Sequence, residues 1–182
     1  MNQLSTQRRV QIVQALCEGN SLRSTSRMAG VSINTVVKLL IDLGTASAEY
    51  QDSALRNLTC QRIQCDEIWS FVYSKAKNVP AQHEGEFGYG DVWTWVGIDA
   101  DSKLAVSWLV GERNAECAHI FMDDVASRLA NQVQLTTDGL KVYLQAVEDA
   151  FGAAIDYAQL VKLYGPEPGA EKRYSPARCI GA

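Results

Sequence analysis

Apolar residues recur at helical spacing through the first fifty positions of the chain. This periodicity predicts helices over residues 6–17, 22–29 and 33 to about 43, with residues 45–57 forming a further helix or a linker. Gly30 suits the tight turn between the second and third helices, and Ser32 suits the N-cap of the third. The expected inward-facing positions of the first and third helices are Val10, Val13, Leu16, Cys17, Ile33, Val36, Val37 and Leu40.

From residue 62 onward the pattern changes to short runs rich in β-branched and aromatic residues. It predicts strands over residues 62–73, 92–98, 104–110, 133–137 and 155–160, with a loop over 75–91. Asn114 is placed to cap a helix that ends near Leu129, and a second helix follows over residues 140–151. The expected inward residues of the first of these helices are Cys117, Ile120, Phe121, Val125 and Leu129. This order predicts an α/β fold with a mixed sheet and an antiparallel edge.

Two aspartates stand at or inside these apolar runs. Asp66 lies in the first predicted strand, and Asp138 ends the fourth. Burial of an unpaired carboxylate is costly, so adjacent strands would bring the two together around a cation such as Mg²⁺. Glu67 alternates to the other face, and Asp66 is preferred as the inward carboxylate because Ile68 would share its face. Taken singly, Asp66 also fits a solvent-exposed edge strand, and Asp138 fits a turn or N-cap.

The charge of the chain is unevenly distributed. Residues 1–50 hold five Lys or Arg against three acids, whereas residues 51–182 hold twelve against eighteen. In the basic first part, Asn34, Thr35 and Lys38 lie on the outer side of the third predicted helix, where they suit contacts to DNA base edges and phosphates. Arg23 and Arg27, one turn apart on the second helix, suit the DNA backbone. The alternative is a three-helix packing module that binds nothing.

Other features of the composition narrow the function classes. The five cysteines are scattered without a CxxC pair, and the two histidines are isolated, which disfavours a zinc site and a disulfide framework. The start of the chain lacks the apolar segment of a signal peptide, and no apolar run approaches membrane-spanning length. We therefore expect a cytoplasmic protein with reduced thiols and no membrane partner.

Residues 1–50 and 51–182 together resemble IS1-type insertion-sequence transposases over essentially the whole chain. The segments that carry the resemblance are Gly30-Val31-Ser32-Ile33-Asn34-Thr35-Val36, Gln64-Cys65-Asp66-Glu67-Ile68-Trp69-Ser70, Trp93-Thr94-Trp95, Gln134-Leu135-Thr136-Thr137-Asp138-Gly139 and residues 157–164. The resemblance implies a helix-turn-helix domain over 1–50, a linker over 51–61, and an RNase H-like DDE catalytic domain over 62–182. It also implies cleavage and joining of double-stranded DNA at transposon ends and target, with Mg²⁺ or Mn²⁺.

Within this resemblance, Asp66 and Asp138 match the first two catalytic and metal-binding acids of the family. A homo-oligomer on DNA and association with the bacterial nucleoid are also expected. The zinc-binding segment that precedes this region in some relatives is absent, and so is the downstream helix with the third acid. Glu171 has a suggestive spacing from Asp138 but lies in a loop-like segment. We therefore expect a catalytic domain incomplete at its C-terminus, with weak or no activity.

Two other functions fit the same residues. The chain could act as a non-enzymatic helix-turn-helix regulator, in which case sequence-specific DNA binding would survive the loss of Asp66 and Asp138. It could also be a metal nuclease unrelated to transposition, which would nick plain duplex DNA without end specificity.

Overall fold

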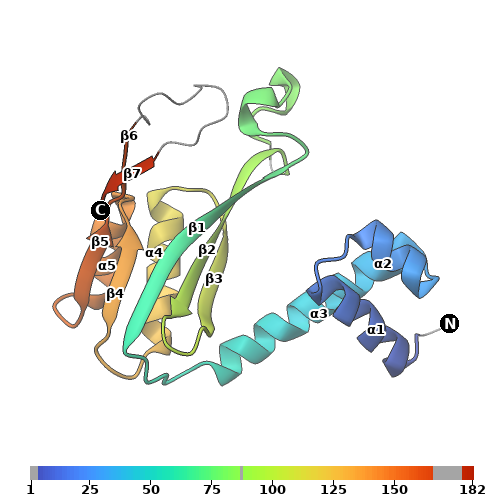
Figure 1. Cartoon of the computed structure of the whole chain (residues 1–182), viewed down its shortest axis with the longest axis horizontal. Helices are drawn as coiled ribbons and strands as arrows, with labels where there is room; N and C mark the ends of the chain where they lie inside the picture. The colour runs from blue at the N-terminus through green and yellow to red at the C-terminus, as the bar shows by residue number, and fades with distance from the viewer. Residues whose placement is uncertain (1–3, 87, 166–177) are drawn as a thin grey trace. The chain divides into compact units, whose positions relative to one another are not determined.

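In the computed structural model, residues 1–54 and 55–182 form separate units, each with its own buried core (Figure 1). The structure describes residues 4–86, 88–165 and 178–182.

The described part of the first unit consists of α1 (Thr6–Cys17), α2 (Leu22–Ala29) and α3 (Ile33–Ala54). The starts of α1 and α2 and the turn after α2 confirm the predicted boundaries, because Ser5 and Ser21 accept hydrogen bonds at the two N-termini and Gly30 adopts a positive φ of 61°. α3 continues to Ala54, well past its predicted end near residue 43. Gly44 does not break it, because the following residues include good helix formers.

The helical faces that pack together in this unit differ partly from the prediction. Ile12, Ala29 and Val36 are buried, and Leu16 and Leu39 pack against them. The predicted inward residues Val10, Cys17, Ile33 and Leu40 are instead exposed. A unit of only three helices buries a narrow stripe on each helix, so residues at the margin of a broad apolar face remain in solvent.

The second unit is built on a five-stranded sheet in the order β3-β2-β1-β4-β5. The strands are β1 (Arg62–Val72), β2 (Gly90–Asp99), β3 (Ala105–Gly111), β4 (Gln134–Asp138) and β5 (Asp156–Leu160). The pairs β1–β2 and β2–β3 are antiparallel, whereas β1–β4 and β4–β5 are parallel. The predicted mixed α/β sheet is therefore confirmed. The strands that carry Asp66 and Asp138 lie next to each other, which the sequence pattern had left open.

Shorter elements complete this unit. The loop between β1 and β2 contains the 3₁₀ turns η1 (Ala76–Asn78) and η2 (Ala81–His83). Beyond β5, β6 (Leu163–Gly165) and β7 (Arg178–Gly181) pair as a separate two-stranded sheet. The sequence pattern did not predict this pair, because each strand is too short to show alternation.

Two helices, α4 (Ala115–Arg128) and α5 (Val142–Phe151), cover one face of the sheet. Asn114 caps α4 as predicted, with its side chain accepting the Cys117 amide. Phe121, Val125 and Tyr143 pack in the core, but Ile120 is 52% exposed and was wrongly expected to face inward. Ala118 and Met122 are buried on α4. The opposite face of the sheet carries the exposed apolar side chains Ile68, Trp108, Val110 and Leu160.

β1 is much longer than its parallel neighbour β4. The β1–β4 pairing ends at Cys65 and Thr137, whereas the pairing with β2 continues to Val72. The second half of β1 therefore has a strand on one side only. Asp66 and Glu67 stand at the point where β4 ends, which leaves space for their side chains beside the strand.

No single helix among residues 4–86, 88–165 and 178–182 is long and apolar enough to cross a membrane. The pair α2 and α3 passes that test of length and composition together, but its axes are bent by 111°.

Candidate active site

Three carboxylates converge at the end of β4. Asp66 and Glu67 come from β1, and Asp138 is the last residue of β4; one oxygen from each lies within 4.8 Å of the others. Neighbouring strand residues normally point to opposite faces of a sheet. Here both β1 carboxylates can approach Asp138, because β4 stops beside them and no longer separates the two faces.

Glu67 is the buried member of the cluster, with its side chain 1% exposed. One oxygen, Oε1, accepts the Tyr143 hydroxyl, and Oε2 accepts Nε of Arg113 at 3.0 Å. Burial raises the pKa of Glu67, although the hydrogen bonds from Tyr143 and Arg113 oppose the rise. The expectation that Asp66 and Ile68 share the inward face is therefore wrong: Ile68 is 62% exposed, and Glu67 follows Ile63 and Cys65 on the helix-covered face.

Asp66 is exposed and lines the open side of the cluster. Its Oδ1 accepts the backbone N–H of Glu67 at 2.8 Å. This bond satisfies a main-chain donor in the part of β1 that has lost its β4 neighbour. Asp66 thus meets Asp138 as predicted, but from a solvated position rather than a buried one, and Glu67, which was expected on the other face, joins them.

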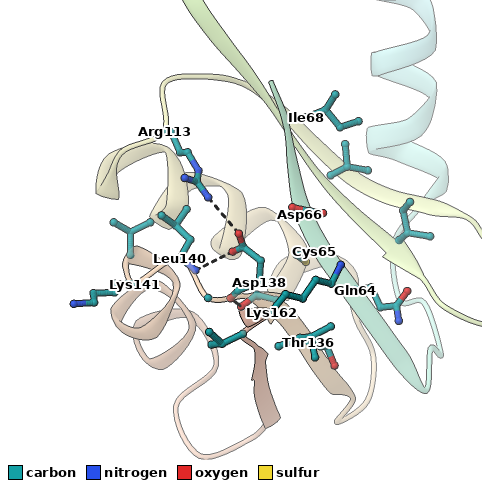
Figure 2. Close-up of a pocket in the computed structure, with 17 residues that line it drawn as sticks. Gln64, Cys65, Asp66, Ile68, Arg113, Thr136, Asp138, Leu140, Lys141 and Lys162 are labelled. Atoms are coloured by element: carbon teal, nitrogen blue, oxygen red, sulfur yellow. Dashed lines mark hydrogen bonds and ion pairs between the residues drawn. The ribbon is translucent and has the colours of Figure 1, made fainter. Parts of the chain in front are cut away.

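Asp138 takes part both in the turn that follows β4 and in the carboxylate cluster. Its Oδ1 accepts the backbone N–H of Leu140 at 2.9 Å, as expected for a residue in a turn before a helix. Its Oδ2 accepts Nη2 of Arg113 at 3.2 Å. The side chain is 37% exposed, so it also faces the adjoining pocket (Figure 2).

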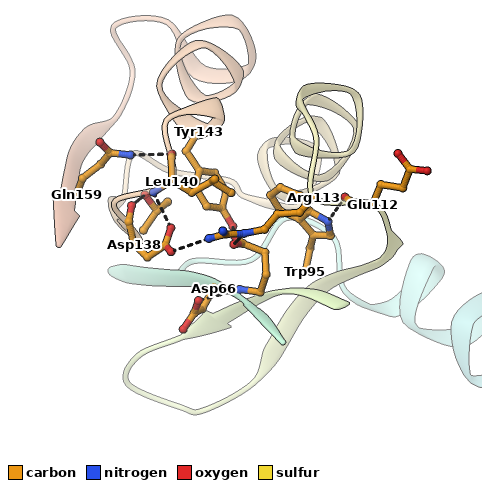
Figure 3. Close-up of polar contacts among 10 residues, drawn as sticks. Asp66, Trp95, Glu112, Arg113, Asp138, Leu140, Tyr143 and Gln159 are labelled. Carbon is orange, nitrogen blue, oxygen red and sulfur yellow. Dashed lines mark hydrogen bonds and ion pairs between the residues drawn. The ribbon is translucent and has the colours of Figure 1, made fainter. Parts of the chain in front are cut away.

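Arg113 joins the cluster from the loop between β3 and α4 and bridges Glu67 and Asp138. Figure 3 shows its guanidinium directed at Asp138. Its guanidinium carbon also lies 4.9 Å from the centre of the Trp93 ring. Sequence reasoning missed Arg113 and Tyr143 because neither lies in a motif. The only available signal was the position of Arg113 directly after a strand, next to the helix cap Asn114.

An open pocket of about 1040 Å³ adjoins the carboxylates. Asp66 and Asp138 line it together with the basic side chains of Lys141 and Lys162, and Arg113 lies on its rim (Figure 2). A lining that combines carboxylates with lysines suits an anionic ligand held through a cation.

The predicted DNA-contacting residues lie on α2 and α3 of the first unit. Arg23, Arg27, Asn34 and Lys38 are exposed, and Lys38 pairs with Asp42 at 3.2 Å. Thr35 is half-buried, and its amide and hydroxyl both bond Ser32 Oγ, at 3.2 and 2.8 Å. Their role in DNA binding stays a prediction.

The predicted alternative acid, Glu171, lies outside the described residues. Comparison with protein-family models gave no match for this chain. Comparison with curated proteins likewise gave no match.

Proposed function

We propose that this protein is a DNA-binding phosphoryl-transfer enzyme of the transposase type, with a helix-turn-helix domain and an RNase H-like catalytic domain. The observation that carries the proposal is the convergence of Asp66, Glu67 and Asp138 within 4.8 Å at the end of β4. The sequence resemblance to IS1-type transposases gives the reaction class, and the open pocket with basic walls is compatible with a DNA phosphate.

The donor set fits Mg²⁺ or Mn²⁺. All three groups offer carboxylate oxygens, and Asp66 and Asp138 are accessible enough for a cation to keep several of its waters. When bound, such ions would stabilise charge on the attacking and leaving oxygens of the phosphodiester. Asp66 and Asp138 would hold them. Glu67 would act as the third acid, a role that the sequence analysis did not predict for it.

The protein's own residues supply positioning and charge around that centre. Lys141 and Lys162 would contact the DNA backbone on the pocket walls. Tyr143 and Arg113 fix the Glu67 carboxylate through one hydrogen bond to each oxygen. Because Arg113 pairs with both Glu67 and Asp138, a cation has to compete with this guanidinium.

The geometry of α2 and α3 supports the DNA-binding part of the proposal. Their axes differ by 111°, within the range of helix-turn-helix motifs, and the turn is made by Gly30 in a left-handed conformation. Ser26 Oγ donates to the carbonyl of Val31 at 2.7 Å, which fixes the turn. Arg23 and Asn34 are exposed on the two helices, as groove and backbone contacts require.

Arg113 also favours a second candidate, a non-enzymatic DNA-binding regulator. A guanidinium that bridges two of the three carboxylates satisfies them without a metal. In a regulator this ion pair would only stabilise the fold, and the first unit would carry the function.

One set of measurements separates the two candidates. Mn²⁺ binding is measured by calorimetry on the full chain, and cleavage is measured on plasmid and linear duplex DNA with Mg²⁺ or Mn²⁺. We expect Asp138→Asn to weaken Mn²⁺ binding at least tenfold and to abolish the weak cleavage of the wild type where there is any, while DNA binding is retained. Asp123→Asn, at an exposed position on α4, is the matched control. DNA binding without Mn²⁺ binding or cleavage in the wild type would reject the enzyme in favour of the regulator.

A further inference from the structure

A row of exposed aromatic side chains leads away from the carboxylate cluster along β1. Trp69 and Phe71 follow Glu67 at alternate positions and so lie on the same face of the strand. Their exposed fractions are 39% and 48%, because this part of β1 extends beyond the buried core. Trp93 is the cross-strand partner of Trp69. We call Trp69, Phe71 and Trp93 the aromatic row.

The aromatic row is connected directly to the candidate active site. Arg113 lies over Trp93, with 4.9 Å from its guanidinium carbon to the ring centre, and the same guanidinium bonds Glu67 and Asp138. At a rise of about 3.3 Å per residue, Trp69 lies roughly 7 Å along the strand from Glu67. This spacing is comparable to that between neighbouring nucleotides.

Positive charge accompanies the rings. The Lys75 ammonium lies 5.0 Å from the centre of the Trp69 ring, and Lys77 follows in the exposed turn. Two acids in or next to the loop between β1 and β2 have polar partners: Glu86 Oε2 lies 2.6 Å from Nδ1 of His83, and Asp91 accepts the Ala76 amide at 2.9 Å. The surface around Trp69 therefore offers an aromatic ring with a lysine ammonium over it, and a base that stacks on this ring would displace the ammonium towards the flanking phosphate.

We propose that the aromatic row binds unpaired nucleotides, with bases stacked on Trp69 and Phe71 and a phosphate held by Lys75. Rings on a strand face can stack only on bases that have left the duplex, so single-stranded DNA is the ligand that this surface fits. The position next to the reacting phosphate rests on the proposed function. The binding itself does not, and it is measured without metal.

The test uses quenching of tryptophan fluorescence by a thymidine dodecamer in EDTA. All four tryptophans lie in residues 55–182, so the signal reports this unit even in the full chain. We expect Trp69→Ala and Phe71→Ala each to weaken binding by about tenfold, because stacking contributes strongly for each base. Lys75→Ala should lower the slope of log K against log salt by about 0.7.

Two further variants make the result decisive. Trp108→Ala, which removes an exposed tryptophan from the opposite face of the sheet, should leave affinity unchanged. Trp69→Phe keeps a ring and should restore affinity to within about threefold of the wild type, which separates stacking from a folding defect. Equal losses in Trp69→Ala and Trp108→Ala, or full affinity in Trp69→Ala, would overturn the proposal.

The outcomes also separate this proposal from its alternatives. Variants that alter sedimentation of the free protein but not DNA affinity would identify the aromatic row as a protein contact and reject nucleotide binding. Stacking-dependent binding in a protein that neither binds Mn²⁺ nor cleaves DNA would reject the proposed enzyme and support this inference. Cleavage that requires Asp138 but tolerates Trp69→Ala, with unchanged binding of the dodecamer, would support the proposed enzyme and reject nucleotide binding by the aromatic row.

Discussion

Replacing Tyr143 by phenylalanine removes one hydroxyl from the centre of the carboxylate network. Tyr143 is fully buried, and its hydroxyl donates to Oε1 of Glu67, whose side chain is 1% exposed. The phenyl ring still fills the space between Trp95 and α5, so the change is almost purely a lost hydrogen bond. Hydrogen bonds to a charged group contribute about 1.5–3 kcal/mol, and we expect Tyr143→Phe to lower the free energy of unfolding by about 2 kcal/mol at pH 7.

The loss should depend on pH. Burial raises the pKa of Glu67, and the Tyr143 hydrogen bond limits that rise, so the variant raises the pKa further. A carboxyl whose pKa is raised by folding favours the folded state at low pH and loses that contribution as pH rises through its folded-state pKa. The deficit of Tyr143→Phe is therefore largest at neutral pH and shrinks towards pH 4, where Glu67 is protonated in both proteins.

Urea unfolding followed by tryptophan fluorescence measures this effect, because every tryptophan belongs to the second unit. Tyr157→Phe is the control: its hydroxyl shares a hydrogen bond with Thr137 at 2.9 Å and contacts no carboxylate in the described network. It should lose about 1 kcal/mol, equally at both pH values. The reasoning is refuted if Tyr143→Phe is as stable as the wild type at pH 7, or if its deficit stays constant down to pH 4.

Three other predictions follow from the contacts described. Arg113→Gln leaves Glu67 and Asp138 without their guanidinium partner, so the free energy of unfolding in EDTA should fall by about 3 kcal/mol. Mn²⁺ should then raise the melting temperature of the variant more than that of the wild type, and an equal rise would contradict this prediction. Burial opposes ionisation of Asp124, but hydrogen bonds from Arg128 and Ser107 outweigh it and lower its pKa. The stabilisation by ionised Asp124 is thus present above about pH 4 and lost as pH falls through the lowered pKa. Asp124→Asn should lower the free energy of unfolding by about 2 kcal/mol at pH 7, and by progressively less towards pH 3, in urea titrations. A difference from the wild type that stays constant with pH would argue against this ion pair. Gly30→Ala places a side chain at a φ of 61° and should cost about 1 kcal/mol, visible as helix melting by far-UV circular dichroism, and an unchanged melt would contradict the turn assignment.

Much of the second unit could be predicted from local patterns. Alternation and turn residues were enough to place the five strands of the larger sheet along the chain, and the end of β4 at Asp138 followed from the apolar run before it. The pattern also placed Asp66 and Asp138 on strands that prove to be neighbours. These features depend on residues close together in the sequence, which is why periodicity reveals them.

The remaining features of the site depend on contacts between distant segments. The choice of Asp66 over Glu67 as the inward carboxylate was wrong because Ile68, which was expected to face inward, is exposed. The rule that adjacent strand residues face opposite sides also excluded a meeting of both carboxylates with Asp138, because it assumes that a neighbouring strand separates the two faces. Arg113 and Tyr143 reach Glu67 from a loop and a helix that are 46 and 76 residues away in sequence. No local pattern encodes such a meeting.

The unequal lengths of β1 and β4 imply that one strand contains two levels of protection against solvent. Amides of β1 up to Cys65 lie between two hydrogen-bonded neighbours, whereas those from Trp69 to Val72 have a strand on one side only. Amide hydrogen exchange should therefore be slow over residues 62–65 and faster, at alternate positions, over 69–72. The carboxylate cluster stands at this boundary, where a rigid sheet gives way to a strand pair that can open locally.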